Sequence, residues 1–272
     1  MRWLPTWFAV IHEASLAIIS ACTLSSAAHE RTRFPAKHEP APASCLQKAG
    51  RLPQSLTLLA VSKTVPAQTV LQFALAGQQA FGENYLQEAV EKITHLADSP
   101  ECPPLEWHFI GPLQSNKTRQ IAQYFNWVHS VDRFKTAKRL SEQRPEGLAP
   151  LNVLVQVNTS GESSKAGVPP HEALALCQQI SALPHLTLRG LMTIPSAMPT
   201  PASHLAHNAT TNLEKEFLVC RTLFQQLQAQ HIGRADTLSM GMSADLELAI
   251  QCGSTCVRVG SALFGARPAK PD

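Results

Sequence analysis

The sequence predicts an α/β protein folded as a single (β/α)8 TIM barrel. Short apolar runs alternate with helix-forming stretches from Leu56 onward, and eight strand-like runs are separated by seven helix-like runs. At 272 residues the chain is long enough for one barrel, since such barrels take about 250 residues. A doubly wound open sheet is the alternative for this pattern, but eight such regular repeats favour closure.

The predicted strands are short runs of apolar and β-branched residues that end in polar or glycine-containing turns. They span residues 56–61, 80–81, 107–110, 127–131, 153–157, 186–192, 237–240 and 257–259. The fifth run is apolar apart from Gln156, which is typical of a strand buried on both faces of a parallel sheet.

The predicted helices carry apolar residues at helical spacing. They span residues 66–76, 86–96, 115–124, 133–143, 170–183, 213–230 and 244–251. No helix is predicted after the eighth strand, and only a weakly helical amino-terminal region is available to fill that gap. Residues 195–209 are expected to form a loop. They form no predicted metal site, because no carboxylate accompanies His204 and His207.

The amino-terminal region differs from the rest of the chain. An apolar stretch within residues 3–28 ends in small residues, as in a signal peptide. However, His12 and Glu13 interrupt that stretch, and Arg2 alone supplies its basic end. No apolar run reaches the roughly 18 residues that a membrane span needs, so neither export nor a membrane span is expected.

The chain is therefore expected to consist of an atypical extension over residues 1–44, one barrel over 45–268 and a tail over 269–272. Residues 29–42 are rich in proline, histidine and charge, which is typical of a linker or a disordered segment. We expect a cytoplasmic protein.

Charge and cysteine content exclude several classes of protein. The net charge is +3, charged residues make up 16% of the chain, and no block of like charges occurs, so nucleic acid is not an expected partner. Seven cysteines are scattered without a Cys-x-x-Cys pair, which predicts neither a disulfide framework nor a zinc site. They are Cys22, Cys45, Cys102, Cys177, Cys220, Cys252 and Cys256.

Lys63 stands at the carboxyl end of the first predicted strand. The apolar run stops at Ser62, and Pro66 suits the first turn of the following helix. Ligands of α/β folds bind at this end of the strands, because the loops there converge on one face. A solvated lysine is the ordinary alternative. The residues that follow favour a ligand.

Glycine and serine turns follow the seventh and eighth predicted strands. Barrels often hold phosphate with these two loops, because free backbone N–H groups and the amino end of a short helix point there. Gly241 permits close backbone approach, and Ser243 is placed to cap a helix beginning at residue 244. Gly260 and Ser261 follow the eighth strand. A turn with a helix cap would explain either loop alone. Both together favour a phosphate site.

Arg258 lies within the eighth predicted strand, between two valines. Strand alternation sends its side chain to the face opposite theirs, where an unpartnered charge would be costly. It could form a structural ion pair inside the barrel or reach a ligand in the barrel mouth.

Lys63, the two phosphate loops and Arg258 together suit an aldehyde-bearing phosphate cofactor. A lysine with a lowered pKa forms a Schiff base with such an aldehyde. Pyridoxal 5′-phosphate (PLP) is the expected cofactor.

Six motifs resemble those of the pyridoxal phosphate homeostasis proteins, also called proline synthetase co-transcribed homologues. The resemblance runs from about Cys45 to Pro268. The motifs are Leu-Leu-Ala-Val-Ser-Lys-Thr (58–64), Phe-Gly-Glu-Asn-Tyr (81–85), Trp-His-Phe-Ile-Gly-Pro-Leu-Gln-Ser-Asn-Lys (107–117), Arg-Gly-Leu-Met-Thr-Ile-Pro (189–195), Leu-Ser-Met-Gly-Met-Ser-Ala-Asp (238–245) and Val-Arg-Val-Gly-Ser-Ala-Leu-Phe-Gly (257–265).

The resemblance implies a barrel like the amino-terminal domain of alanine racemase, which is fold type III among PLP proteins. It implies a role for each matched residue: Lys63 as the Schiff-base lysine, Asn84 beside the cofactor, Ser243, Gly260 and Ser261 on the phosphate, and Arg258 facing the pyridine nitrogen. Met242 and Lys117 are secondary candidates, and the roles of His108 and Asn116 are open. The residues before Ser44 do not resemble the helix with which family members begin.

Family members resemble carriers that buffer free PLP without a known turnover. We therefore expect a monomeric PLP-binding protein of vitamin B6 homeostasis, with PLP-dependent apoenzymes as possible recipients of the cofactor. A PLP-dependent amino-acid racemase is the alternative, although no residue stands out as a base opposite Lys63. A phosphate-binding barrel without PLP is a third hypothesis.

Overall fold

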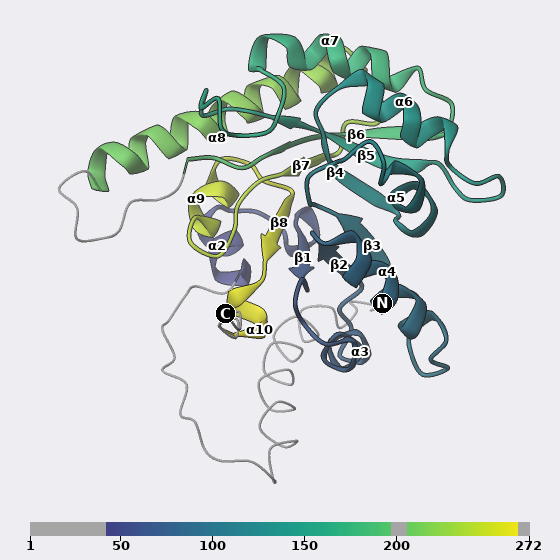
Figure 1. The fold of residues 1–272 in the computed structure, drawn as a ribbon. Helices are drawn as coiled ribbons and strands as arrows, with labels where there is room; N and C mark the ends of the chain where they lie inside the picture. The colour runs from purple at the N-terminus through teal and green to yellow at the C-terminus, as the bar shows by residue number, and fades with distance from the viewer. Residues whose placement is uncertain (1–41, 197–205, 266–272) are drawn as a thin grey trace, which may run out of the picture.

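The computed structural model describes residues 42–196 and 206–265 and confirms the predicted barrel. Eight parallel strands close in chain order, with β8 pairing with β1 (Figure 1). The strands are β1 (Thr57–Val61), β2 (Ala80–Glu83), β3 (Glu106–Phe109), β4 (Trp127–Val131), β5 (Leu151–Val157), β6 (Leu186–Thr193), β7 (Thr237–Ser239) and β8 (Cys256–Val259).

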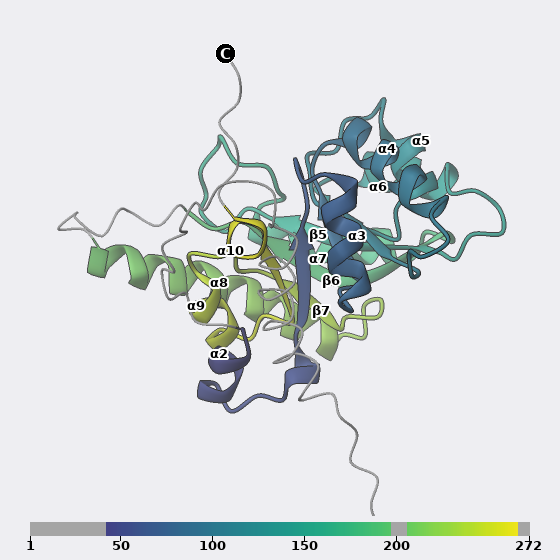
Figure 2. The ribbon, with the colours of Figure 1, turned by 90° about the horizontal axis from the view of Figure 1, so that it is seen from below.

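Helices surround the strands, with α3 to α6 on one side and α8, α9 and α2 on the other (Figure 2). The helices are α2 (Pro42–Lys48), α3 (Ala67–Leu75), α4 (Leu86–Ala97), α5 (Thr118–Tyr124), α6 (Phe134–Glu142), α7 (Pro170–Ser181), α8 (Ala206–Ala229), α9 (Leu246–Gln251) and α10 (Ser261–Phe264), with a 3-10 turn at Pro53–Ser55. Each of the seven predicted helices is present.

Two helix starts differ from the prediction by three residues or more. Helix α8 begins at Ala206, seven residues before the predicted start. The loop expected over 195–209 is therefore wrong for residues 206–209, which are helical and include His207. Residues 206–212 carry no apolar spacing that could mark a helix in the sequence. Helix α5 begins at Thr118, three residues later than predicted. His204 and the rest of residues 197–205 lie outside the described part of the chain.

Helix α2 fills the gap between β8 and β1 that the sequence left open. It lies beside α9 in both views (Figures 1 and 2) and packs into a cluster with α9 and β8. The buried members of this cluster are Cys45, Leu46, Leu246, Ile250, Val257 and Val259. The sequence analysis also missed α10, a single turn after β8 that ends at Gly265, whose φ is +83°.

The extension predicted over 1–44 and the tail predicted over 269–272 lie almost wholly outside the described residues. Within the described part of the chain, no helix has both the length and the apolar character that a membrane span requires. Six cysteines lie in that part, and five of these are buried, as small apolar packing residues would be.

The strands separate two packing environments. Ala60 belongs to the large apolar cluster beneath the helices, whereas Leu59 packs in a separate small cluster with Cys256. Because side chains alternate along a strand, Leu59 and Cys256 face the barrel interior. Arg258 is the pairing partner of Leu59 and therefore also points inward.

The packing of α2 generates a stability prediction. The Leu46 side chain is only 4% exposed, whereas Leu52 is 73% exposed. Leu46→Ala should lower the free energy of unfolding by about 2–4 kcal/mol, because it leaves a cavity in a packed cluster. Leu52→Ala is the matched control and should change it by less than about 0.5 kcal/mol. Urea unfolding measures both. Equal losses would show that α2 does not complete the barrel wall.

Candidate functional site

The carboxyl ends of neighbouring strands bring the predicted site residues to one mouth of the barrel. Val61 of β1 pairs with Gly82 of β2, so Lys63 and Asn84 leave adjacent strands two residues later. Ala60 pairs with Val259 of β8, which places Gly260 on the other side of the loop that carries Lys63. Lys63 itself is partly buried.

Asn84 is held in place by backbone packing. A side chain at Gly111 would collide with the backbone of Asn84, so only glycine permits the close approach of these two segments. The Oδ1 atom of Asn84 is buried, and no hydrogen-bond donor reaches it within the described residues. An unsatisfied acceptor of this kind at a barrel mouth is suited to a ligand.

The two serine loops also meet. The Oγ atoms of Ser243 and Ser261 are 3.5 Å apart, although they follow different strands. Both loops depend on glycine: Gly241 has a φ of +97° and lies against Ala249, and Gly260 lies against the backbone of Val61. The mouth therefore presents two hydroxyls at the place where barrels bind phosphate.

The prediction that Ser243 caps the helix after β7 is wrong. Helix α9 begins at Leu246, and its N-cap residue is Asp245. The carboxylate of Asp245 accepts the backbone N–H of Met242 at 2.5 Å, which closes the turn ahead of the helix. Because the helix begins at Leu246 and Asp245 occupies the N-cap position, the hydroxyl of Ser243 is not committed to capping the helix.

The two secondary candidates are both exposed. Met242 lies in the turn after β7 and its exposed fraction is 39%. Lys117 precedes α5, in the connection after β3, so β2 separates its strand from that of Lys63. Their positions show them at the same end of the barrel as Lys63.

Arg258 lies inside the barrel and is 4% exposed. Its guanidinium donates to the carbonyl and hydroxyl oxygens of Ser239 at 2.9 and 2.8 Å and to the carbonyl of Thr193 at 2.9 Å. These acceptors are neutral, so its hydrogen bonds do not form the ion pair considered from the sequence. Burial raises the pKa of the neighbouring Cys256 to about 11, and its thiol therefore stays protonated beside the arginine.

A buried chain of hydrogen bonds continues from Ser239 across the barrel. The Ser239 hydroxyl lies 3.1 Å from Nδ1 of His129, whose Nε2 lies 2.9 Å from Nδ1 of His108. Nε2 of His108 lies 3.3 Å from the carboxylate of Glu106. Burial lowers the pKa of His108 and lowers that of His129 well below its ordinary value, so both rings are neutral.

One proton arrangement satisfies every member of this chain. A carboxylate only accepts, so His108 donates from Nε2 and accepts at Nδ1. His129 then donates from Nε2 and accepts the Ser239 proton at Nδ1. The oxygen of Ser239 is left to accept from Arg258. The chain therefore fixes the tautomer of each histidine and the direction of the serine hydroxyl.

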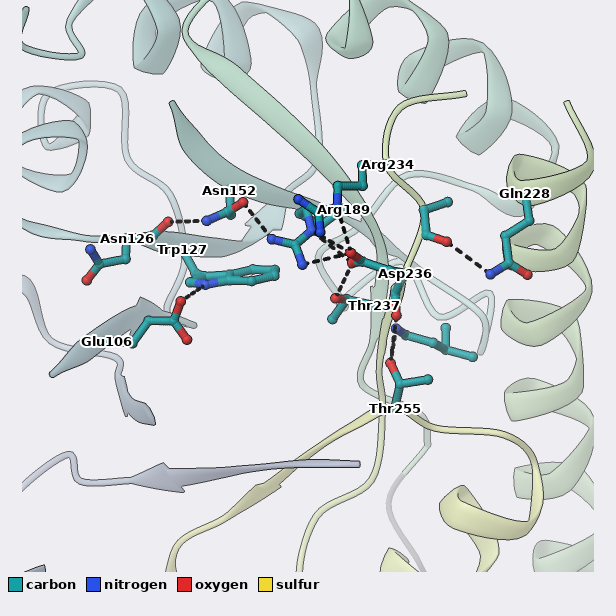
Figure 3. A network of polar contacts seen from close by, with 12 residues as sticks. Glu106, Asn126, Trp127, Asn152, Arg189, Gln228, Arg234, Asp236, Thr237 and Thr255 are labelled. Carbon is teal, nitrogen blue, oxygen red and sulfur yellow. Dashed lines mark hydrogen bonds and ion pairs between the residues drawn. The ribbon is translucent and has the colours of Figure 1, made fainter. Parts of the chain in front are cut away.

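A polar network at the opposite end of the barrel anchors this chain. Figure 3 shows Arg189 between Asp236 and Asn152, beside the ring of Trp127. The guanidinium lies 4.5 Å from the Trp127 ring centroid, and the indole N–H donates to Glu106 at 2.7 Å. The hydrogen bond from His108 lowers the pKa of Glu106 below its ordinary value, so Glu106 remains a carboxylate.

The sequence analysis did not find Ser239, His129 or Thr193 as site residues. His129 shares strand alternation with Trp127, which could have indicated an inward side chain. A lone histidine in a buried strand does not by itself indicate a role, however. Within the described part of the chain, no group of three or more His, Cys, Asp or Glu side chains could hold a metal ion.

The barrel and its mouth define a class of protein. The family model of the alanine racemase N-terminal domain matches residues 46–268. This match covers the whole strand and helix repeat described above, including the lysine loop and both serine loops.

Curated relatives narrow the class. A Vibrio cholerae protein named pyridoxal phosphate homeostasis protein is 54% identical over 224 residues, which cover 82% of this chain and 91% of the relative. A protein of the same name from Pseudomonas aeruginosa is 56% identical over 221 residues, covering 81% of this chain and 89% of the relative. The chain belongs to the pyridoxal phosphate homeostasis protein family.

A solved structure agrees with this assignment. PipY from Synechococcus elongatus, whose structure was determined with PLP bound, superposes with a TM-score of 0.68 at 37% sequence identity. The superposition covers 83% of this chain and all of PipY.

The two buried histidines predict how stability depends on pH. Their folded-state pKa values are lowered, so between the folded and unfolded values the unfolded chain binds more protons. Stability should therefore fall as pH drops below about 6.5, by up to about 1.4 kcal/mol per pH unit for each histidine. Urea unfolding between pH 7 and 5 measures this slope.

His129→Asn is the variant that tests the assignment. The amide oxygen of asparagine can still accept from Ser239, but the side chain does not titrate. The two histidines together make the free energy of unfolding fall as pH is lowered, and the variant should lose about half of that dependence. An unchanged slope would show that His129 is not the buried neutral group.

Proposed function

We propose that this protein binds PLP covalently, as a Schiff base on Lys63, and serves PLP homeostasis without catalysing a reaction. One observation carries the proposal: a lysine, a pair of serine hydroxyls and a buried arginine converge on one barrel mouth, in a family with a PLP-bound member. The names of the curated relatives support homeostasis as the role and do not favour a racemase.

The residues present fit PLP. Lys63 would supply the amine for the aldehyde, and Ser243, Gly260 and Ser261 would hold the phosphate through hydroxyl and backbone N–H donors. The buried Oδ1 atom of Asn84 would accept from the cofactor. Met242 and Lys117, both exposed, would contribute to the rim of the site.

Arg258 would face the pyridine nitrogen and keep that nitrogen unprotonated. A guanidinium always donates and does not give up its proton in proteins. When bound, PLP stabilises carbanions through a protonated ring, and an arginine partner weakens this ability. The site is therefore suited to holding PLP and not to racemisation.

The extent of the barrel, the location of the protein and its partners are also part of the proposal. The barrel is proposed to span residues 45–268, between an atypical extension over 1–44 and a tail over 269–272. We propose a cytoplasmic monomer that delivers PLP to PLP-dependent apoenzymes, with neither nucleic acid nor membrane as a partner. The names of the relatives, which refer to PLP homeostasis, support a role in maintaining the supply of the cofactor.

Borohydride reduction followed by peptide mass mapping tests the covalent bond. Protein saturated with PLP should carry a pyridoxyl group on Lys63, and Lys63→Ala should lose it. Lys117→Ala should keep the label at Lys63, because Lys117 is not the Schiff-base residue. An unlabelled Lys63 in saturated protein would overturn the proposal and leave a phosphate-binding barrel without a Schiff base.

Turnover assays separate the proposal from the racemase alternative. The PLP-loaded protein, not reduced with borohydride, should not racemise amino acids, whereas a racemase would exchange the α-hydrogen of its substrate with solvent deuterium. Proton NMR of each amino acid in deuterated buffer measures that exchange. Catalytic exchange that requires Lys63 would establish the alternative.

The serine pair predicts how the phosphate is recognised. Ser243→Ala and Ser261→Ala should each weaken PLP binding about tenfold, because each removes a hydrogen bond to a charged group. Binding of pyridoxal, which lacks the phosphate, should stay the same in both variants. Ser181→Ala, on α7, is the control and should bind PLP as the wild type does. Equal losses for PLP and pyridoxal would rule out a phosphate contact at these serines.

A further inference from the structure

Both chain neighbours of Lys63 are tied to helix α4. The carbonyl of Ser62, on one side, accepts from the ammonium of Lys92 at 2.8 Å. The backbone N–H of Thr64, on the other side, donates to the carboxylate of Glu88 at 2.6 Å. Glu88 and Lys92 are one helical turn apart and form an ion pair at 3.0 Å. The loop that carries Lys63 is thus held at two points by one pair of side chains.

Every N–H donor of the Lys92 ammonium has an acceptor in this arrangement. Its third acceptor is Glu83, whose carboxylate lies 2.6 Å away, so three acceptors match its three N–H donors. The same carboxylate oxygen accepts the hydroxyl of Ser62 at 2.7 Å. The Lys92 side chain is 4% exposed and that of Glu83 is fully buried.

These charges lie between the helices and the sheet, where they are costly. Burial raises the pKa of Glu83, although Lys92 and Ser62 partly offset this effect. The second oxygen of Glu83 is buried and has no hydrogen-bond partner among the described residues. A buried ion pair often stabilises a fold no better than apolar residues of similar volume. Packing alone therefore does not account for charged residues in this position.

The loop itself needs to be held. Thr64 has a φ of +64°, a left-handed conformation that is unfavourable for a β-branched residue. The turn is closed by the N–H of Val65, which donates to the carbonyl of Ser62 at 3.0 Å. Ser62, the residue after β1, faces α4 through its contacts with Glu83 and Lys92. The strained turn that carries Lys63 therefore lies between the two contacts with α4.

We propose that Glu88 and Lys92 are positioning residues for Lys63, which hold the backbone on both sides of it so that its amine meets the aldehyde of the cofactor. This inference rests on the proposed function. The contact between Glu88 and Thr64 carries it, because the ion pair of Lys92 with Glu83 would form without that contact.

Two substitutions of Glu88 test this role. Its side chain is 32% exposed, so the fold tolerates a change there better than at the buried Lys92. Glu88→Ala removes the acceptor for Thr64, whereas Glu88→Gln keeps an amide oxygen in the same place. The readout is the fraction of bound PLP that borohydride traps on Lys63, measured beside total bound PLP and the melting temperature.

Glu88→Ala should lower the ratio of trapped to untrapped PLP about tenfold, as expected for the loss of a charge-assisted hydrogen bond. Glu88→Gln should stay within about twofold of the wild type, because a neutral acceptor remains. Glu142→Ala is the matched control, since Glu142 and Lys138 form an exposed pair with the same spacing on α6. It should leave trapping unchanged.

The outcomes separate the two proposals. A wild-type protein that binds PLP but is not trapped would overturn the proposed function. A trapped wild type with equal trapping in Glu88→Ala would overturn the positioning role alone. A lower melting temperature for Glu88→Ala with unchanged trapping would also overturn it, because that result is what a purely structural ion pair produces.

Discussion

The site depends on the burial of one cation. Arg258 lies inside the barrel at 4% exposure, where an uncompensated charge would cost several kcal/mol. Three acceptors from β6 and β7 meet its guanidinium, and none of them carries a charge. The groups that hold the arginine in place therefore do not neutralise its positive charge. A carboxylate in contact with it would reduce that charge and compete with a ligand.

The barrel holds Arg258 and Lys63 by two separate arrangements. In the barrel interior, hydrogen bonds through two neutral histidines connect Ser239 with Glu106. The network around Arg189 fixes the carboxylate of Glu106 at the far end of the barrel. Outside the strands, Glu88 and Lys92 hold the loop on either side of Lys63. In each arrangement, a flexible, charged residue is held by neighbouring residues. Those neighbours are themselves fixed in one conformation by their hydrogen bonds. The proposed PLP site needs both arrangements, since in that proposal the amine meets the aldehyde and the arginine faces the ring nitrogen on the opposite side of the ring.

The strands could be predicted from the sequence, because an apolar run bounded by turn residues is a local signal. The sequence was also sufficient to place Lys63 and the serine loops at one mouth of the barrel, since the ends of parallel strands converge. Signals that are not local were missed. Helix α2 is stabilised by packing against α9, and the N-cap position predicted for Ser243 is occupied by Asp245, whose carboxylate binds the N–H of Met242. The histidine chain joins residues more than 100 positions apart, and no spacing predicts it.

A crystal structure of the protein with PLP tests the central claim most directly. The account predicts continuous electron density between Lys63 and the cofactor, with the phosphate between Ser243 and Ser261. It also predicts that Arg258 faces the ring nitrogen and keeps its contacts with Ser239 and Thr193. PLP bound away from Lys63, or an arginine that has left Ser239 to pair with a carboxylate, would contradict the account.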